Sequence, residues 1–391
     1  MRIKITNGTV ITPGRELRDS TVVVEDGKIR GVHEGAVDVP GARVIDAAGC
    51  YVSPGFIDLH VHGGGGHDFM DGTPEAFLRI AAMHAKHGTT AMVPTTLTAE
   101  REDLLKVLDA YEIAHRANSG GAGFLGMHLE GPYFALSQRG AQDPRYIRDP
   151  DPEEYEAILA HSPSIARWSA APELPGAIAF GRRLREKGIL AAIAHTDALY
   201  DDVLTAYENG YSLVTHLWSA MSGVTRRNAF RYAGVIESAL LLDLDVEVIG
   251  DGIHVPAPLL KLVYKVKGPG RIALITDAMR AAGMPEGESV LGALDGGLRV
   301  IVEDGVAKLP DRSAFAGSVA TMNRALRSMV QLGEVPLMEA VRMASSTPAR
   351  IMGVADRKGS LAVGMDADIA IFDADFEVRT TIVMGKVVHG E

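Results

Sequence analysis

The segment from Pro54 to Gly66, PGFIDLHVHGGGG, places two histidines just before a run of glycines. In an extended strand successive side chains point to opposite faces, so His60 and His62 lie on the same side. Neutral imidazole is the commonest metal ligand in proteins, and the glycines leave the end of the strand open to an ion. A buried strand whose histidines bond to the backbone is the alternative, which a single histidine would favour. Two histidines at this spacing predict a metal site.

Ionisable residues also follow other apolar stretches of the chain. They are Glu130 in HLEGP, His195 in AHTDA, His216 in THLWSAM and Asp277 in LITDAM. Any one of them alone could be a structural polar group. Burying so many ionisable groups together without a cation would be costly, however. If the ends of these stretches meet in space, the set predicts a single metal centre.

The chain between residues 51 and 278 has the pattern needed to bring these residues together. Apolar stretches alternate with amphipathic helical segments, which is typical of a parallel α/β sheet. We expect strands over residues 51–62, 89–97, 124–131, 165–172, 190–197, 212–218, 245–254 and 271–278. Eight such units over about 300 residues predict a (β/α)8 TIM-like barrel, whose chemistry sits at the carboxyl ends of the strands.

Both ends of the chain read as short strands instead. Residues 1–52 contain the hairpin signals Asn7-Gly8 and Asp26-Gly27, and residues 356–391 return to strand texture. We therefore expect a small β-sandwich domain assembled from residues 1–52 and 356–391, with the catalytic barrel over residues 53–355. Within the barrel region, residues 288–318 predict a β insertion, followed by helices over 319–333 and 336–352.

Composition and charge exclude several classes of protein. The chain has 391 residues, 47% hydrophobic and 23% charged, as in ordinary globular proteins. Its 39 Lys and Arg against 50 Asp and Glu give a net charge of −11 without a basic stripe, so neither nucleic acid nor membrane is expected as a partner. The single cysteine, Cys50, excludes an intrachain disulfide and a cysteine-based metal site. Without an apolar leader or a membrane-length apolar run, a cytoplasmic protein is expected.

The ordered motifs resemble those of the N-acetylglucosamine-6-phosphate deacetylases, a family of the amidohydrolase superfamily. The resemblance covers nearly the whole chain and rests on HLEGP, AHTDA, THLWSAM, DGIHV and LITDAM. It implies that Glu130, His195 and His216 hold one metal ion. It also implies that Asp277 is the catalytic acid and base.

The histidine pair of the first strand implies a second ion. Family members with His-x-His at this place bind two metals, so the resemblance implies that His60 and His62 are ligands, that Glu130 bridges both ions and that Asp277 reaches the first. The fourth strand, RWSAAPE, has no lysine, which argues against the superfamily subtype with a carbamylated lysine. Histidine and carboxylate ligands suit zinc, which we expect, but also iron, manganese or cobalt.

The resemblance also implies residues that bind the substrate. His254 in DGIHV is expected to hydrogen-bond the substrate, with orientation of a metal ligand as the alternative. Gln142 in RGAQDP could donate to the acetyl carbonyl or the sugar but could not shuttle protons. Phe315 is expected to cover the acetyl group or the sugar face, with a place in the core as the alternative.

A sugar phosphate would need its own binding groups. The resemblance implies the backbone amides of Ser219 and Ala220 and an arginine that the partner of a homodimer supplies. In TRRNAFRYAG, Arg227 aligns best, with Arg226 and Arg231 as rivals. Arginine pairs bidentately with phosphate, although a solvated basic loop is the alternative.

The predicted function is metal-dependent hydrolysis of the acetamide of N-acetylglucosamine 6-phosphate to glucosamine 6-phosphate and acetate. An amide has a poorly electrophilic carbonyl and a poor leaving group, so its hydrolysis needs both an activated water and a proton donor. A divalent ion and Asp277 would supply them. The alternatives are deacetylation of another N-acetylhexosamine or its phosphate, a cyclic amidohydrolase, and a non-enzymatic scaffold.

Overall fold

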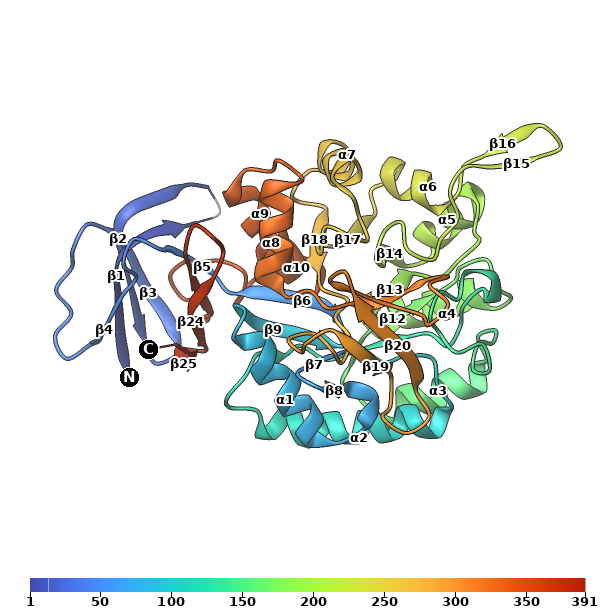
Figure 1. Cartoon of the computed structure of the whole chain (residues 1–391), viewed down its shortest axis with the longest axis horizontal. Helices are drawn as coiled ribbons and strands as arrows, with labels where there is room; N and C mark the ends of the chain where they lie inside the picture. The colour runs from blue at the N-terminus through green and yellow to red at the C-terminus, as the bar shows by residue number, and fades with distance from the viewer. Residues whose placement is uncertain (13, 391) are drawn as a thin grey trace.

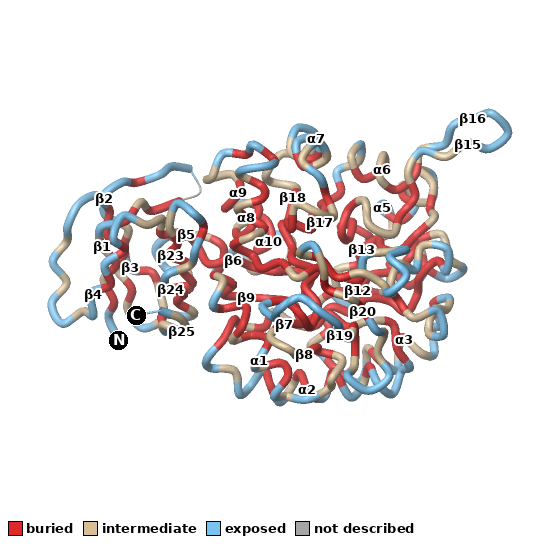
Figure 2. The backbone as a smooth tube through the Cα atoms, viewed as in Figure 1, coloured by how far each residue is buried: buried red, intermediate tan, exposed pale blue. Residues whose placement is uncertain are grey.

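The computed structural model of the chain describes residues 1–12 and 14–390. Strands from both ends of the chain form a lobe at one side, and the larger part consists of parallel strands with helices around them (Figure 1). Figure 2 shows that the parallel strands are mostly buried, whereas the hairpin of β15 (Thr225–Arg227) and β16 (Phe230–Tyr232) is mostly exposed. Within the described residues, every helix is too short or too polar to span a bilayer.

One mixed sheet joins the two ends of the chain. Its strands run in the order β25-β24-β23-β5-β1-β2-β3, and β4 pairs with β1. These strands are β1 (Arg2–Ile11), β2 (Glu16–Glu25), β3 (Lys28–Glu34), β4 (Arg43–Asp46), β5 (Tyr51–Pro54), β23 (Ile369–Phe372), β24 (Val378–Val383) and β25 (Lys386–His389). The antiparallel pairing of β23 with β5 brings the C-terminal strands onto the N-terminal ones.

Of the two predicted hairpins in this sheet, one is present and one is wrong. Asp26 and Gly27 form the turn between the antiparallel strands β2 and β3, both with positive φ. At Asn7-Gly8, by contrast, β1 continues through an irregularity in its pairing with β2. A glycine is needed there because β5 passes close by: a Cβ on Gly8 would lie 2.7 Å from Val52 Cγ2.

The parallel strands form two sheets that curl toward each other. The first contains β6 (Phe56–Val61), β9 (Thr89–Pro94) and β10 (Gly123–Phe124). The second contains β11 (Met127–Glu130), β12 (Ile165–Ala170), β13 (Leu190–Ile193), β14 (Tyr211–Val214), β17 (Asp245–Ile249) and β18 (Ile272–Ile275). Parallel bridges between Thr95 and His128 and between Val61 and Ala278 join the two sheets at both edges.

Each of the predicted parallel strand regions contains a strand of these sheets. The region 51–62 is divided, however, because β5 pairs with the terminal sheet while β6 pairs with β9. The break falls at Gly55, where a Cβ would lie 2.1 Å from Thr90 Cγ2. The glycine lets the chain pass close to β9 as it leaves one sheet for the other.

The helices between the strands surround the curled sheet (Figure 1). Their buried apolar side chains form one core cluster with those of the strands. They are α1 (Pro74–Ala85), α2 (Arg101–Ala117), α3 (Pro152–His161), α4 (Ala177–Glu186), α5 (Tyr200–Glu208), α6 (Val235–Leu241) and α7 (Ala257–Lys267). The helix α1 shows why they begin where they do. The side chain of Thr73 accepts a hydrogen bond from the Ala76 N–H, and Pro74 occupies the first helical position, where its missing N–H costs nothing.

The segment after the last parallel strand holds the predicted insertion. The strands β19 (Gly287–Leu291), β20 (Leu298–Glu303), β21 (Val306–Lys308) and β22 (Phe315–Ser318) form an antiparallel sheet beside the strand ends. The first predicted helix corresponds to α8 (Met322–Gln331). The second, predicted over 336–352, is divided at Ser345 into α9 (Leu337–Ala344) and α10 (Ser346–Ile351). The division places Pro348 in the first turn of α10, where proline is tolerated.

Candidate metal centre and substrate cavity

The predicted ligands meet at the carboxyl ends of the parallel strands. His60 lies within β6 and His62 directly follows it, and Glu130 ends β11. The other three candidate ligands each lie two residues beyond a strand: His195 after β13, His216 after β14 and Asp277 after β18. These three have φ values of 46°, 32° and 49°, a left-handed conformation that is uncommon for residues other than glycine. Such strained backbone clusters at functional sites, where the surrounding structure holds it.

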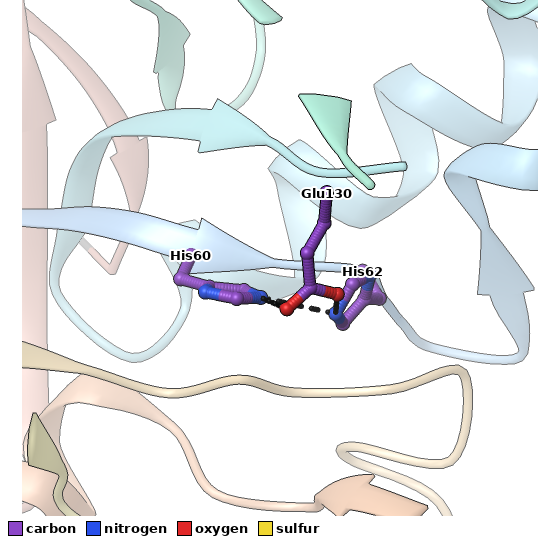
Figure 3. A group of neighbouring side chains, drawn as sticks. All are labelled: His60, His62 and Glu130. Carbon is purple, nitrogen blue, oxygen red and sulfur yellow. Dashed lines mark hydrogen bonds and ion pairs between the residues drawn. The ribbon is translucent and has the colours of Figure 1, made fainter. Parts of the chain in front are cut away.

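His60, His62 and Glu130 form the first group of candidate ligands (Figure 3). Glu130 Oε1 lies 3.4 Å from His60 Nε2, and Glu130 Oε2 lies 3.4 Å from His62 Nε2. The two Nε2 atoms are 3.1 Å apart. Asp277 joins this group, because its Oδ1 lies 3.2 Å from His62 Nε2 and 3.6 Å from His60 Nε2.

Glu130, His195 and His216 form the second group. Glu130 Oε1 lies 3.4 Å from His195 Nε2 and 3.0 Å from His216 Nε2. The same carboxylate therefore faces both groups, as a bridging ligand would. Nδ1 of His195 lies 2.9 Å from the carbonyl oxygen of Gln138, which turns Nε2 toward Glu130.

The charges in this cluster fit a bound cation. Burial alone would raise the pKa of Glu130, but the neighbouring histidines hold that pKa well below its usual value. Burial opposes a charge on His62, yet Asp277 and Glu130 raise the pKa of its imidazole to about 9. The carboxylates thus demand positive charge at the point where the Nε2 atoms converge. A divalent ion would meet this demand with nitrogen and oxygen ligands of the kind zinc prefers.

A cavity of about 380 Å³ opens above the ligands. It is lined by ligand side chains together with Leu97, Ser137, Gln138, Gly140, Ala141, Gln142, Trp218, Ser219, Ala220, His254, Leu291, Ala314, Phe315 and Gly317. Five predicted substrate-binding residues are in this lining: Gln142, Ser219, Ala220, His254 and Phe315. The volume is in the range of small-molecule sites.

Gln142 is held between the cavity and the candidate metal ligands. Its Nε2 donates a hydrogen bond to Glu130 Oε2 at 2.7 Å. Its Oε1 accepts from the backbone N–H and the hydroxyl of Thr98, at 2.9 and 3.0 Å. The amide is therefore fixed in one orientation and contacts the carboxylate that faces both ligand groups.

His254 and Phe315 lie together at the cavity wall. His254 Nδ1 lies 2.6 Å from Asp251 Oδ2, which leaves Nε2 as the nitrogen available to a ligand. The ring centroids of His254 and Phe315 are 4.6 Å apart. Phe315 is 42% exposed, so the alternative of a core phenylalanine is wrong.

The predicted phosphate-binding groups are distributed differently. Ser219 and Ala220 line the cavity, but the Ser219 N–H donates to the His216 carbonyl at 2.9 Å. The arginines lie on the hairpin of β15 (Thr225–Arg227) and β16 (Phe230–Tyr232), which projects from the molecule (Figures 1 and 2). Arg226, Arg227 and Arg231 are all exposed, and the described lining of the cavity includes none of them. Within one chain, the hairpin thus stays apart from the cavity.

Several other residues lie next to the candidate ligands without belonging to either ligand group. The two nitrogens of His128 contact Thr95 Oγ1 at 3.2 Å and Ser169 Oγ at 2.7 Å. Its ring packs edge-on against that of His60, with the ring centroids 4.9 Å apart. Trp218 was not predicted, although it follows a ligand motif by two residues and lines the cavity. Two further charged residues that the sequence analysis missed, Arg167 and Glu247, lie below the ligands. A charged residue in the middle of a predicted strand was the available signal for both.

Comparison with known proteins agrees with this geometry. The model of the Amidohydrolase family matches residues 51–388. A curated N-acetylglucosamine-6-phosphate deacetylase from Lysinibacillus sphaericus is 34% identical, over 98% of this chain and 97% of its own. An N-acetylgalactosamine-6-phosphate deacetylase from Escherichia coli O157:H7 is 33% identical, over 95% of each chain.

A solved structure extends the comparison to the fold. A mutant N-acetyl-D-glucosamine-6-phosphate deacetylase from Mycobacterium smegmatis, in complex with N-acetyl-D-glucosamine-6-phosphate, is 34% identical and superposes with a TM-score of 0.90, over 100% of this chain and 99% of its own. Matches of this length leave no part of the site outside the alignment. The chain belongs to the Amidohydrolase family and, within it, to the N-acetylglucosamine-6-phosphate deacetylases.

Proposed function

We propose that this protein hydrolyses the acetamide of N-acetylglucosamine 6-phosphate to glucosamine 6-phosphate and acetate. One observation carries the proposal: four histidines and two carboxylates converge at the base of a cavity of about 380 Å³ in a chain that is 34% identical to deacetylases of this substrate. The set contains all that amide hydrolysis requires of side chains, namely metal ligands and an acid and base.

Two ions fit the ligand groups. His60, His62 and Asp277 would hold the first, His195 and His216 the second, and Glu130 would bridge them. A bound divalent ion, zinc in the first place, supplies a water of lowered pKa and polarises the acetyl carbonyl. Iron, manganese or cobalt would suit the same ligands.

Asp277 carries the proton transfers. Burial would raise its pKa, but His60 and His62 keep this pKa below the ordinary value, so the carboxylate is ionised at neutral pH. It can therefore accept a proton from the attacking water and deliver it to the leaving nitrogen. A water nucleophile explains why the site needs no serine or cysteine.

The cavity lining binds the sugar. His254 Nε2 and Gln142 are suited to hydrogen-bond the acetyl or sugar oxygens, and Phe315 covers one face of the ligand. The backbone at Ser219 and Ala220 is suited to the phosphate end. The Ala220 N–H is the stronger candidate of the two, because that of Ser219 already donates to the His216 carbonyl.

A homodimer would complete the phosphate site. The β15–β16 hairpin exposes three arginines, and Val224, Phe230 and Tyr232 on or beside it are 57%, 70% and 40% exposed. Exposed apolar side chains that lie together mark protein–protein contact sites. Docking of this hairpin on a second copy would cover Phe230 and bring an arginine, first of all Arg227, to the partner's cavity. Arg226 and Arg231 remain the rival residues.

The same proposal includes the architecture. The curled parallel sheet, joined at both edges by bridges, supports a (β/α)8 barrel over residues 53–355. The shared terminal sheet supports one β-sandwich domain from residues 1–52 and 356–391. In such a barrel the carboxyl ends of all strands lie at one rim, so the proposed ligands at these ends would lie together there.

The test is acetate release from matched substrates. We expect release from N-acetylglucosamine 6-phosphate, and much less from N-acetylglucosamine, which lacks the phosphate. The 6-phosphate of N-acetylgalactosamine belongs in the same assay, because a relative that is 33% identical is named for that epimer. Release from N-acetylgalactosamine 6-phosphate alone would assign that epimer as the substrate instead. Hydrolysis of a cyclic amide, with no acetate release from any of these sugars, would overturn the proposal.

A further inference from the structure

A buried ion pair lies beneath the candidate metal centre. Arg167 on β12 and Glu247 on β17 both have side chains that are 0% exposed. Arg167 Nη2 donates to Glu247 Oε2 at 2.9 Å, and Nη1 donates to Oε1. A buried ion pair often adds little to the stability of a protein, so stability alone does not explain why this pair is present. Its other contacts indicate its role.

Glu247 contacts one histidine in each ligand group. Its Oε2 lies 3.4 Å from Nδ1 of His60, which belongs to the first group. The same oxygen accepts a hydrogen bond at 3.3 Å from the backbone N–H of His216, which belongs to the second group. Nδ1 of His216 has no hydrogen-bond partner among the described residues, so its backbone bond to Glu247 adds a restraint beside the contact of its Nε2 with Glu130.

Arg167 contacts the residue before each of these two histidines. Its Nη1 donates to the carbonyl oxygen of Leu59 at 3.0 Å, and its Nη2 donates to Thr215 Oγ1 at 2.9 Å. The guanidinium thus ties β6 to the end of β14 at the level just below the ligands. Its planar fork of donors suits it to hold several acceptors at once.

We propose that Arg167 and Glu247 form a positioning pair that fixes His60 and His216 for metal binding and so couples the two metal sites. A hydrogen bond from His60 Nδ1 to Glu247 keeps the proton on Nδ1, which leaves the lone pair of Nε2 directed at the metal cavity. Arg167 in turn holds Glu247 and both ligand segments in register. This inference rests on the metal-dependent function proposed above.

The chain offers a matched control on the same strand. Asp245, the first residue of β17, is paired with Arg350, with Asp245 Oδ1 and Arg350 Nη2 2.6 Å apart, and the same oxygen lies 3.5 Å from Arg271 Nη1. None of the contacts described for this pair involves a metal ligand. Loss of the Asp245–Arg350 pair therefore reports what an ion pair on β17 contributes to stability without any role toward the metals.

The experiment compares three variants of the pair with this control. Glu247→Asp keeps the charge beside Arg167 but withdraws the oxygen from His60. The double variant Arg167→Met/Glu247→Leu removes the whole pair without leaving an unpaired buried charge, and Arg167→Met/Glu247→Gln restores one acceptor for His60 Nδ1. The control is Arg350→Met/Asp245→Asn. Zinc per subunit is measured after dialysis against graded chelator concentrations, with the melting temperature, kcat and KM of each protein.

We expect Glu247→Asp and the Met/Leu variant to lose zinc at chelator concentrations about 10- to 100-fold lower than the wild type does. The Met/Gln variant should recover part of this loss. The control should melt at a lower temperature but keep wild-type zinc retention. A loss of kcat with little change in KM should accompany the loss of zinc, because the pair does not reach the substrate cavity.

Two contrary results have different meanings. If the pair variants retain zinc and kcat as the wild type does and only melt earlier, the pair is structural and the inference is wrong. If the wild type itself takes up no zinc or other divalent ion, the proposed metal centre is wrong, and this inference fails with it.

Discussion

At the scale of single residues, the site depends on the position of the Glu130 carboxylate between the two groups of histidines. Its two oxygens face four histidine nitrogens and also accept a hydrogen bond from Gln142. A carboxylate with this many partners must keep one orientation for both ligand groups to exist at once. Gln142, itself held by Thr98, is the neutral group that fixes this orientation.

Substitution of Gln142 tests this role. Gln142→Leu keeps most of the side-chain volume but removes the donor to Glu130, so we expect kcat/KM to fall by about 10- to 100-fold. Steady-state kinetics and zinc content measure the effect. Thr98→Val is the matched control: it removes the hydroxyl but keeps the backbone N–H bond to Gln142, so its loss should be smaller. Equal activity of Gln142→Leu and the wild type would contradict the role.

Asp277 is the second residue whose chemistry can be isolated. Asp277→Asn preserves the shape but cannot accept a proton, so kcat should fall by about 10²- to 10⁴-fold. Zinc content, measured in parallel, separates this loss from loss of metal. An Asn variant that retains metal and wild-type kcat would exclude Asp277 as the acid and base.

At the scale of elements, strand ends and the loops after them determine the site. The order of strands and the ionisable residues at their ends could be predicted, because apolar runs and motifs are local in the sequence. Arg167 and Glu247 could not be paired in advance, because 80 residues separate them. Two other strands, β13 and β14, also lie between β12 and β17, so only the curl of the sheet brings the two side chains together. Likewise, Ser345 divides a predicted helix whose apolar pattern continues through it.

The helix α1 contributes a contact that depends on pH. His84 Nε2 lies 2.9 Å from the carbonyl oxygen of Gly63 in β7 (Gly63–Gly64), directly after the proposed ligand His62. Burial lowers the pKa of His84 to about 4, from an ordinary value of 6.5. Because the folded protein holds the neutral form, the unfolded chain binds more protons between these pH values. The contribution of neutral His84 to the free energy of unfolding is therefore fully present above about pH 6.5, and it is lost as the pH falls toward 4.

We expect this residue alone to account for about 3 kcal/mol of the acid-induced loss in the free energy of unfolding. Urea unfolding of metal-free protein, at pH values between about 7 and 4, compares the wild type with His84→Gln, which keeps a donor for Gly63 but does not titrate. The variant should lose less stability on acidification. Parallel curves for the two proteins would show that His84 is not the titrating group.

At the scale of the whole molecule, an acidic chain with a net charge of −11 carries three arginines on one projecting hairpin. Since the hairpin stays apart from the cavity of its own chain, a phosphate role for Arg227 requires a second copy. The arginines are evident in the sequence, and the dimer is implied by the resemblance. The fold adds a reason to expect that the arginines act in a dimer, because the hairpin extends outward with Phe230 exposed.

Mixed dimers test this arrangement directly. Asp277→Asn and Arg227→Ala proteins are each expected to be weakly active alone. In a heterodimer, one cavity combines the intact Asp277 of one chain with the intact Arg227 of the other. Refolding or subunit exchange of a mixture should therefore restore activity, with KM near that of the wild type. No recovery in a verified heterodimer would contradict an arginine supplied in trans, and the same mixture with Arg226→Ala or Arg231→Ala distinguishes the rivals.

The most direct measurement is acetate release from N-acetylglucosamine 6-phosphate by one preparation of protein, first stripped of metal and then given zinc in steps. We predict little release from the stripped protein and recovery that is complete at two ions per subunit. Full release from protein shown to be free of metal would contradict the central claim. So would no release from protein that holds both ions.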